Sequence, residues 1–345
     1  MKTLTPLLTA GALAGAAALV ARRAPDDLRG EVAIVTGASR GLGLLLAGEL
    51  ARQGCRLVIC ARDALELDRA AAQLREAGAD VTTVACDVTD EAAPSRLVET
   101  ALERYGRLDI VLSNAGIIQV GPVQEASPEL FEIALDTMAL APARLALEAL
   151  PVMRRQQHGR IVTVASIGGK LSVPHLLPYS TAKFAAVGFS EGLRAELGRG
   201  PVTVTTVVPG LMRTGSHLQA RFIGQADKEF TWFSLGASLP LISMDAERAA
   251  RQIVGAVRER RAEIILTPAG QVVSRVAGLA PGLTSGVLHL VQKLALPGPP
   301  VATTADGGEG TPGQDLDPAF SRKAFDRLTA LGRTAARRFN ERPSP

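Results

Sequence analysis

From Glu31 onward, short apolar runs alternate with segments of helical periodicity, and this alternation limits the fold more than any other feature of the sequence. The apolar runs cover residues 32–35, 57–60, 81–85, 110–112, 161–164 and 202–208, and the helical segments cover 43–53, 63–77, 91–105, 128–156 and 178–198. Such a pattern indicates right-handed βαβ units. It predicts an α/β fold with one doubly wound parallel sheet and helices on both faces.

Glycines follow the first apolar run at the spacing that phosphate binding requires. The run leads into Thr36-Gly37-Ala38-Ser39-Arg40-Gly41-Leu42-Gly43. Gly37 permits a tight turn, Gly41 lets the backbone approach a pyrophosphate at the next helix N-terminus, and Gly43 allows that helix to pack closely on the strand. A Rossmann-type dinucleotide site is therefore predicted. Its expected contacts here are Thr36, Gly37, Ser39, Arg40, Gly41, Leu42 and Gly43.

The end of the second strand selects between the two nicotinamide dinucleotides. A carboxylate there would accept the 2′-hydroxyl of NAD and repel a 2′-phosphate, but the position is Ala61, followed by Arg62. With Arg40 in the nearby glycine loop, two guanidiniums fit a 2′-phosphate, so we expect NADP(H) rather than NAD(H). In the alternative, Arg62 is only solvated and Asp63 serves NAD(H). We expect Asp63 to cap the next helix instead.

Two further strand ends are expected to reach the same groove, because ligands of parallel sheets bind beyond the carboxyl ends of the strands. Asp87-Val88 follows the third strand, where it would fix an adenine ring. Asn114-Ala115-Gly116 follows the fourth strand and supplies a small turn that allows close approach. Both segments therefore join the predicted cofactor site.

The residues that carry chemistry follow the fifth strand. Ser166 ends that strand, and Tyr179 and Lys183 have an i, i+4 spacing that places phenol and ammonium on one helical face. A neighbouring ammonium and a cationic nicotinamide favour the phenolate, so we expect a lowered tyrosine pKa. Tyr179 would donate a proton to a carbonyl oxygen as hydride reaches carbon, or take one from an alcohol in reverse. Ser166 would hydrogen-bond the same oxygen.

Together these residues resemble the short-chain dehydrogenase/reductase family over about residues 29–270. The matching positions are the glycine loop, Asp87, Asn114-Ala115-Gly116, Ser166, Tyr179, Lys183, Pro209-Gly210 and Thr214. The resemblance implies one Rossmann-type domain, a nicotinamide cofactor, and Ser/Tyr/Lys chemistry on an alcohol or carbonyl. It also implies that Tyr179 and Lys183 contact the cofactor, with Pro209, Gly210 and Thr214 on the nicotinamide side.

The chain departs from the family pattern at one position. The family commonly has an asparagine two residues after Asp136, and its backbone helps to hold a water that relays protons to the lysine. The residue here is Met138, and the chain has only two asparagines, Asn114 and Asn340. We expect a slower or rewired proton relay rather than a loss of activity.

Residues 211–243 form the variable insertion that usually covers the substrate in this family. Its large apolar side chains are Leu211, Met212, Phe222, Ile223, Phe230, Trp232, Phe233, Leu235 and Leu239. An apolar pocket closed by this segment would take a lipophilic ketone, aldehyde or secondary alcohol. Two alternatives stay open: these side chains pack on the core or a second subunit, or Arg213, Arg221 and Lys228 select an acidic substrate.

The N-terminal segment, residues 1–28, is apolar. Leu4 to Ala21 contains no charge, and Arg22-Arg23 follows it. As a helix this stretch would span about 27 Å, just short of a bilayer core. We expect an uncleaved anchor that leaves the main domain in the cytoplasm. A surface-bound extension and a cleaved signal peptide are the alternatives.

The C-terminal end divides into three parts. Residues 271–296 are apolar, with a helical face at Leu283, Val287, Leu290, Val291 and Leu294, and form either a second membrane contact or a docked helix. Residues 297–317 are rich in Gly and Pro and predict a linker. Residues 318–345 predict a basic amphipathic helix with a stripe at Phe320, Ala324, Leu328, Leu331, Ala335 and Phe339. This helix would either lie on an anionic membrane or dock on the main domain.

Composition excludes several classes of function. The chain has only twelve aromatic residues, which argues against stacking on nucleic acid. The net charge is +4, but residues 318–345 alone carry +5, so the body of the chain offers no basic surface for phosphate backbones. Three cysteines and four scattered histidines have no ligand spacing, so no metal is expected.

The sequence thus predicts an NADP(H)-dependent oxidoreductase that transfers hydride between the nicotinamide and a lipophilic carbonyl or secondary alcohol. One alternative is a catalytically impaired NADP(H)-binding or membrane-scaffolding protein on the same fold. Another is a nucleotide-sugar epimerase or dehydratase, although those relatives carry a larger C-terminal substrate domain. The segments at 128–156 and 178–198 often form a homo-oligomer interface in the family, so self-association stays open.

Overall fold

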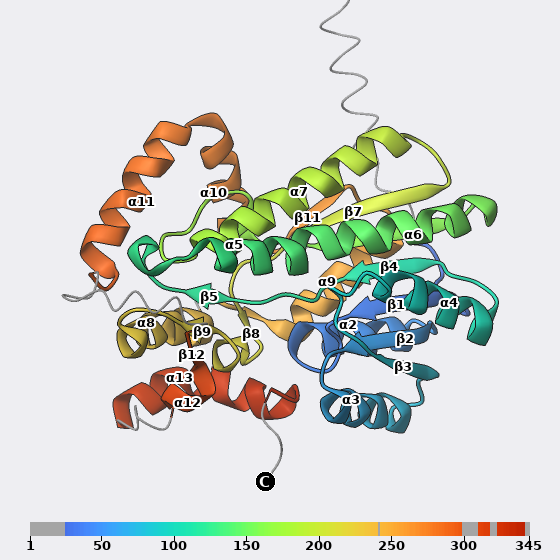
Figure 1. The fold of residues 1–345 in the computed structure, drawn as a ribbon, viewed down its shortest axis with the longest axis horizontal. Helices are drawn as coiled ribbons and strands as arrows, with labels where there is room; N and C mark the ends of the chain where they lie inside the picture. The colour runs from blue at the N-terminus through green and yellow to red at the C-terminus, as the bar shows by residue number, and fades with distance from the viewer. Residues whose placement is uncertain (1–24, 241, 299–309, 318–322, 342–345) are drawn as a thin grey trace, which may run out of the picture.

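The core of the molecule is a parallel sheet of seven strands (Figure 1). The computed structural model describes residues 25–240, 242–298, 310–317 and 323–341. The strands lie in the order β11-β7-β6-β4-β1-β2-β3. Their bounds are β1 Val32–Thr36, β2 Arg56–Ala61, β3 Val81–Ala85, β4 Ile110–Ser113, β6 Gly159–Val164, β7 Val202–Val208 and β11 Glu263–Ile265. The order reverses between β1 and β4, which confirms the predicted doubly wound sheet.

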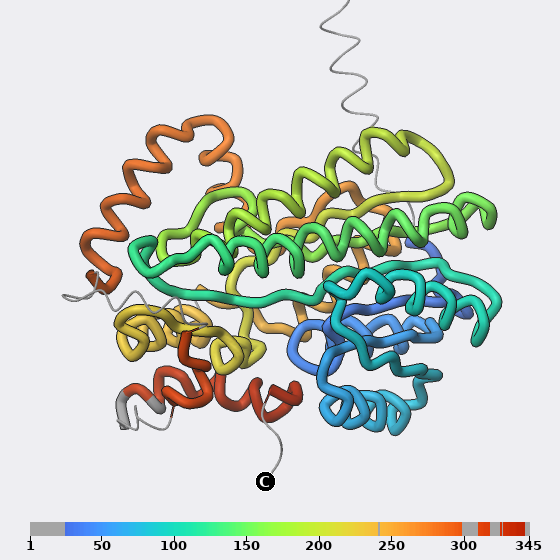
Figure 2. The backbone as a smooth tube through the Cα atoms, viewed as in Figure 1, coloured from blue at the N-terminus to red at the C-terminus, as the bar shows by residue number. Residues whose placement is uncertain are grey.

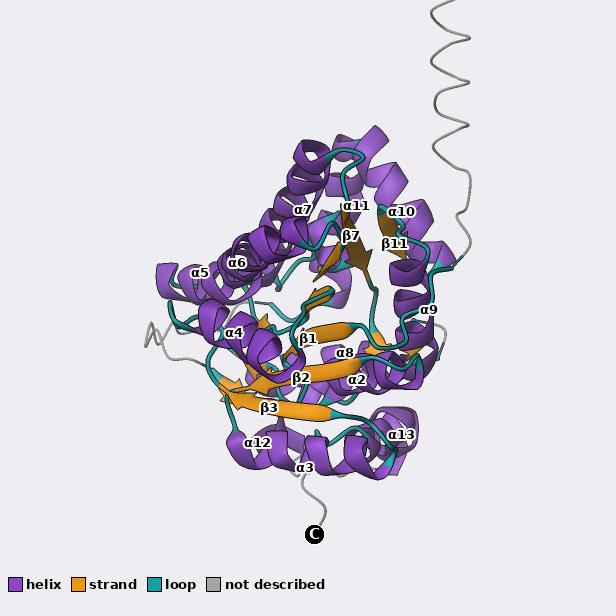
Figure 3. Cartoon of the chain, turned by 90° about the vertical axis from the view of Figure 1, so that its right-hand side faces the viewer, coloured by secondary structure: helices purple, strands orange, loops and turns teal. Residues whose placement is uncertain are grey.

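Helices cover both faces of this sheet (Figure 3). One face carries α2 Gly41–Arg52, α3 Ala64–Glu76 and α9 Ala246–Arg258, and the other carries α4 Ala93–Tyr105, α6 Ala141–Arg155 and α7 Leu177–Leu197. In β1, Ala33 and Val35 pack on the first layer, whereas Val32 and Ile34 pack on the second. Because both faces are covered, the strand is apolar from Val32 to Val35.

The helical segment expected at 128–156 is interrupted. α5 Pro128–Leu135 is followed by a π-helical turn, η2 Asp136–Leu140, and then by α6. Such turns are rare and are frequent at functional sites. The turn buries Met138 against Ala134 and Ala182, with Tyr179 packed beside them. The irregular backbone therefore falls at the position where the sequence departs from the family pattern.

The insertion at 211–243 folds into short elements beside the carboxyl edge of the sheet. They are β8 Met212–Arg213, η4 Ser216–Leu218, β9 Arg221–Phe222 and α8 Ala226–Ser238. β9 pairs with β5 Gln119–Val120 and β12 Thr311–Pro312, and β8 pairs with β10 Met244–Asp245. Phe222, Phe230 and Phe233 are buried together, with 5.4 Å between the Phe222 and Phe230 ring centroids. These three aromatic residues pack on the core rather than line an open pocket.

A helical hairpin, α10 Pro268–Leu279 and α11 Pro281–Ala295, stands away from the sheet (Figure 1, orange). Gly270 is the single buried residue of α10, and none is buried in α11. The face predicted at Leu283, Val287, Leu290, Val291 and Leu294 is exposed. The expectation of a docked helix here is therefore wrong, because α11 turns its apolar face away from the protein.

The last described helix, α13 Lys323–Arg338, runs beneath α8 and ends beside the β1–α2 loop (Figures 1 and 2). Ala335 and Phe339 of the predicted stripe are buried against Ala246 and Leu45, so part of the stripe docks on the main domain. The described residues include no helix with the length and apolar character needed to cross a bilayer. The anchor predicted at 4–21 lies outside the described residues. The remaining short elements are η1 Val123–Glu125, η3 Ile167–Gly169 and α12 Gly313–Leu316.

Candidate active site

The glycine loop has the close approaches that the sequence predicted. Gly37 has φ +64°, and a Cβ there would lie 2.8 Å from the Ala115 Cα. A Cβ on Gly43 would lie 2.0 Å from the Gly37 carbonyl oxygen, so α2 packs directly on the end of β1. Arg40 precedes α2 without a capping side-chain hydrogen bond. A helix N-terminus that its own N-cap side chain leaves uncapped, at a glycine turn, fits the pyrophosphate of a dinucleotide.

Hydrogen bonds join the ends of β1 and β4. The Thr36 hydroxyl accepts from the backbone N–H groups of Asn114 and Ala115, at 3.0 and 3.1 Å. The Asn114 side-chain amide donates to the carbonyls of Thr36 and Gly37, at 3.1 and 3.2 Å. Gly116 continues this turn, and its Cα faces the Met138 thioether. The structure thus brings the first and fourth strand ends together, as the sequence predicted.

The predicted adenosine end carries paired charges. Arg40 forms an ion pair with Glu66 at 2.5 Å, and the Ser39 hydroxyl donates to the same carboxylate at 3.3 Å. Arg62 is 67% exposed and lies 3.8 Å from Asp87. Glu66, in the first turn of α3, was not expected at this site from the sequence.

The residues on either side of this charged cluster have structural partners of their own. Asp63 caps α3 by accepting the Glu66 N–H at 2.9 Å, as expected. The Asp87 carboxylate also accepts from the backbone N–H and the hydroxyl of Thr89, at 2.9 and 2.8 Å. Leu42 is buried in the first turn of α2.

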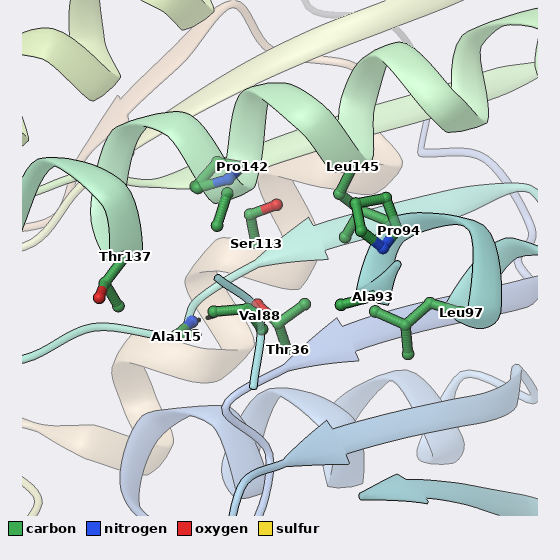
Figure 4. Close-up of a pocket in the computed structure, with 11 residues that line it drawn as sticks. Thr36, Val88, Ala93, Pro94, Leu97, Ser113, Ala115, Thr137, Pro142 and Leu145 are labelled. Carbon is green, nitrogen blue, oxygen red and sulfur yellow. Dashed lines mark hydrogen bonds between the residues drawn. The ribbon is translucent and has the colours of Figure 1, made fainter. Parts of the chain in front are cut away.

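A cavity lies where these strand ends meet α4 and α6 (Figure 4). Thr36, Val88 and Ala115, all expected at the cofactor site, line it together with Ser113 and Thr137. Its remaining lining is apolar: Ala93, Pro94, Leu97, Ala141, Pro142 and Leu145. Val88 is among the lining residues and Asp87 is not, so the adenine position assigned to Asp87-Val88 stays a prediction.

Ser166, Tyr179 and Lys183 meet at the carboxyl end of β6. Ser166 caps η3, and its hydroxyl accepts from the Gly168 N–H at 3.1 Å. Ser166 and Tyr179 are neighbours, because a Cβ built on Gly168 would lie 3.1 Å from the Tyr179 ring and 3.5 Å from the Ser166 hydroxyl. Lys183 is 4% exposed, donates to the Val164 carbonyl at 2.8 Å, and holds its ammonium 5.7 Å from the Tyr179 ring centroid. The three side chains predicted to carry the chemistry therefore lie together.

The protonation of this cluster differs from the sequence expectation. Burial raises the pKa of Tyr179, and the hydrogen bond from Ser166 offsets only part of that rise. Burial lowers the pKa of Lys183 to about 8. The expected lowering of the tyrosine pKa is wrong for the protein alone, because desolvation outweighs an ammonium that turns toward Val164. At neutral pH the phenol holds its proton, as a proton donor requires.

The residues expected on the nicotinamide side extend from the end of β7. Pro209 accepts the Ile167 N–H through its carbonyl at 2.8 Å, which fixes this turn against η3. Thr214 is 3% exposed, and its hydroxyl accepts from the Ser216 N–H at 3.2 Å. Gly210 leaves open space, since the Thr267 hydroxyl, 3.9 Å from a Cβ built there, is its nearest neighbour.

A buried polar cluster ties the insertion to the loop before Tyr179. His175 contacts the Glu229 carboxylate through Nδ1 at 2.8 Å, and Trp232 donates its indole N–H to the same carboxylate at 2.6 Å. His175 and Glu229 are both buried. The sequence analysis did not single out these residues, because a lone His and a helical Glu give no local signal. They fix α8 relative to the catalytic helix.

Comparisons with known proteins agree with this geometry. The family model described as short chain dehydrogenase matches residues 31–221, and the chain belongs to the short-chain dehydrogenase/reductase family. Dehydrogenase/reductase SDR family member 4 of Bos taurus is 36% identical over 196 residues, which are 56% of this chain and 70% of that protein. The chain is therefore an NAD(P)-dependent oxidoreductase that acts on CH–OH or C=O groups.

Two solved structures show the same fold. A short-chain dehydrogenase/reductase from Burkholderia phymatum in complex with NAD has TM-score 0.68 and 27% identity, covering 74% of this chain and 96% of that one. An actinorhodin polyketide ketoreductase variant with NADPH has TM-score 0.60 and 30% identity, covering 68% and 95%. These neighbours support a nicotinamide cofactor without distinguishing NAD from NADP.

Proposed function

We propose that the chain is an NADP(H)-dependent oxidoreductase for lipophilic ketones or aldehydes and the matching secondary alcohols, with Tyr179 as general acid and base. The observation that carries the proposal is the cluster at the carboxyl end of β6, in which the partly buried Tyr179 lies beside the buried Ser166 and Lys183. The cofactor supplies or accepts hydride when bound. The chain's own residues position the carbonyl and move the proton.

Each of the three side chains has a distinct role. Ser166 places a hydroxyl beside the Tyr179 oxygen, where both can hydrogen-bond one substrate oxygen. Tyr179 delivers its proton to that oxygen in reduction and removes a proton from the alcohol in oxidation. Lys183, held by the Val164 carbonyl, keeps a positive charge near the ring below pH about 8 and stabilises the phenolate that forms.

Two observations support NADP(H) over NAD(H). One oxygen of the Asp63 carboxylate caps α3, which argues against Asp63 as the acceptor for a ribose 2′-hydroxyl. Arg62 projects into solvent near Asp87 and is free to turn toward a 2′-phosphate. Glu66 favours the opposite choice, because its carboxylate lies on Arg40. Arg62→Ala should therefore weaken NADPH binding about tenfold and leave NADH binding unchanged; equal losses for both would instead support NAD(H).

An apolar substrate is supported by the surroundings of Tyr179. Ile118, Val173 and Leu211, all partly buried, pack with it against the aromatic cluster of the insertion. Ordered apolar surface beside a general acid favours a substrate with a hydrophobic body. We expect turnover to rise from short to long aldehydes and ketones.

The decisive experiment measures turnover of the full chain and of Tyr179→Phe with NADPH and NADH over a panel of carbonyls of increasing chain length. We expect NADPH oxidation that Tyr179→Phe lowers by at least about a hundredfold without loss of NADPH binding. The matched control is Tyr105→Phe, since Tyr105 hydrogen-bonds Thr82 and Asp80 and should keep full activity. NADPH binding with no turnover in either direction would favour the catalytically impaired alternative, which Met138 supports.

We also propose that the protein associates with a membrane surface. The predicted anchor at 4–21 supports this, and so does the α10–α11 hairpin, whose apolar faces are exposed. No acidic residue occurs from 264 to 305, whereas Arg275 and Lys293 flank the exposed faces. The full chain should sediment with anionic phospholipid vesicles, and a Leu283→Glu, Leu290→Glu double variant should bind them less. Equal binding by both proteins would exclude the hairpin as the contact.

A further inference from the structure

The final described residues of the chain lie on the glycine loop (Figure 2). The Phe339 carbonyl accepts the Gly41 backbone N–H at 2.8 Å. The Asn340 side-chain amide donates to the carbonyls of Ser39 and Glu66, at 2.7 and 3.2 Å. The Phe339 contact occupies the Gly41 N–H, a backbone donor that a dinucleotide pyrophosphate needs at the N-terminus of α2, and the Asn340 contacts hold the segment on the loop.

The Glu341 side chain occupies the space above Gly41. Its carboxylate is 4% exposed and lies 3.4 Å from the Arg40 guanidinium. A Cβ built on Gly41 would lie 2.5 Å from the Glu341 carboxylate oxygen. A group that approaches the Gly41 backbone must therefore displace this carboxylate.

Close packing of α13 holds the segment in place. A Cβ on Gly332 would lie 2.3 Å from the Ser238 hydroxyl, and one on Gly215 would lie 2.5 Å from the Ala336 Cα. Beyond the helix, Gln219 donates its side-chain amide to the Glu341 carbonyl at 3.0 Å. The small residues let α13 sit directly on α8, which aims residues 339–341 at the loop.

We propose that Phe339–Glu341 is an internal competitor for the phosphate end of the cofactor groove, which the dinucleotide must displace in order to bind. The proposal rests on the proposed NADP(H) function, because it assigns regulation to the same site. Docking and cofactor binding use the same Gly41 N–H and the same space, so they exclude each other. Arg40 is shared in the same way, because Glu66 and Glu341 hold the guanidinium that a 2′-phosphate would attract.

Competition of this kind has a measurable consequence. The apparent affinity for the cofactor is the intrinsic affinity multiplied by the fraction of molecules in which the segment is undocked. A variant that weakens docking should therefore bind cofactor more tightly, although it removes contacts from the folded protein. A merely structural tail would have the opposite effect or none.

The first test is the dissociation constant for NADPH of the full chain and of Asn340→Ala. Loss of the two hydrogen bonds to Ser39 and Glu66 should tighten NADPH binding about tenfold. Thr334→Ala, on the exposed side of α13, is the matched control and should bind as the unaltered protein does. Gly332→Leu, which clashes with Ser238, provides a second route to undocking and should also tighten binding.

The second test follows hydrogen exchange at the end of the chain. The Glu341 N–H donates to the Ala336 carbonyl at 2.9 Å and should be protected in the free protein. Saturating NADPH should speed exchange of residues 339–341, because the segment leaves the groove. Slower exchange with NADPH would show that the tail closes over the cofactor, and would overturn the proposal.

The outcomes separate this proposal from the proposed function. If the full chain binds NADPH and Asn340→Ala binds it equally or more weakly, the competitor proposal fails and the oxidoreductase proposal stands. If the full chain, Asn340→Ala and Gly332→Leu all fail to bind either NADPH or NADH, the proposed function fails and the competitor proposal fails with it.

Discussion

The two ends of the cofactor groove are assembled in different ways. At the nicotinamide end, Ser166, Tyr179 and Lys183 come from one strand–loop–helix unit and already lie together. At the phosphate end, the β1–α2 loop is covered by residues that follow it by about 300 positions, with Asn340 and Ser39 in direct contact. The catalytic residues are therefore close together in the sequence, whereas the segment that covers the glycine loop is distant from it along the chain. The two ends should respond differently to substitution.

The largest expected effect is at the nicotinamide end. Lys183→Met removes the buried ammonium whose Nζ lies 5.7 Å from the Tyr179 ring centroid. Turnover should fall about a hundredfold or more, because the phenolate that forms on proton transfer loses its stabilising charge. NADPH affinity should fall much less than turnover, because the variant loses one expected cofactor contact while the phosphate end is untouched. Steady-state turnover and equilibrium NADPH binding, measured on the same protein, separate the effect on proton transfer from the effect on cofactor binding.

Lys293→Met, on the exposed face of α11, is the control for loss of a lysine charge and should keep full turnover. A Lys183 variant that loses NADPH affinity in proportion to its turnover would show that the two ends are not independent. The contrast between them would then be lost.

The nicotinamide end could be predicted from sequence because its rules are local. Tyr179 and Lys183 share a helical face at i, i+4 spacing, and Ser166 lies two residues beyond a strand whose apolar run is easy to recognise. The contact between Thr36 and Asn114 follows from the convergence of parallel strand ends. The six strands predicted from apolar runs are all present, whereas the three-residue β11 was too short to recognise.

The phosphate end could be predicted only in part. The stripe containing Ala335 and Phe339 was visible in the sequence, but its docking site was not, because that depends on small residues such as Gly215 that are distant along the chain. The π-helical turn at 136–140 was missed for a related reason: its flanking segments keep the periodicity of one helix. Burial raises the pKa of Tyr179, whereas the neighbouring Lys183 in the sequence had suggested a lowered pKa.

A smaller effect is expected at the phosphate end, where NADPH binding should depend on pH through Glu341. Burial raises the pKa of docked Glu341 to about 8 from the ordinary 4.5, Arg40 opposes that rise, and Glu66 adds to it. Because the docked form holds the proton more tightly, docking is strongest in acid and weakens as pH rises from about 4.5 to about 8. NADPH binding should therefore tighten over this range, by up to about tenfold per pH unit.

Glu341→Gln makes the side chain neutral at every pH and keeps its shape, so the segment should stay docked in base. Binding isotherms for NADPH at pH 6, 7 and 8 should show a steep improvement in the unaltered protein and a flat, weaker affinity in the variant. The other charges that face this segment, Arg40, Glu66 and Arg69, are present in both proteins, and NADH isotherms control for titration of the 2′-phosphate. Equal slopes in both proteins would assign the pH dependence to the cofactor.

The smallest expected effect returns to the nicotinamide end, at the position where the family commonly has asparagine. Met138 is 2% exposed in the π-helical turn and packs beside Tyr179 and Ala182. Met138→Asn should raise turnover about fivefold, which corresponds to one water-mediated hydrogen bond in the proton relay worth about 1 kcal/mol. It should also lower the free energy of unfolding by about 1–3 kcal/mol, because the buried thioether becomes an amide. Turnover and denaturant unfolding measured together test both effects, and an unchanged or lower rate in a folded variant would show that the relay does not pass through this turn.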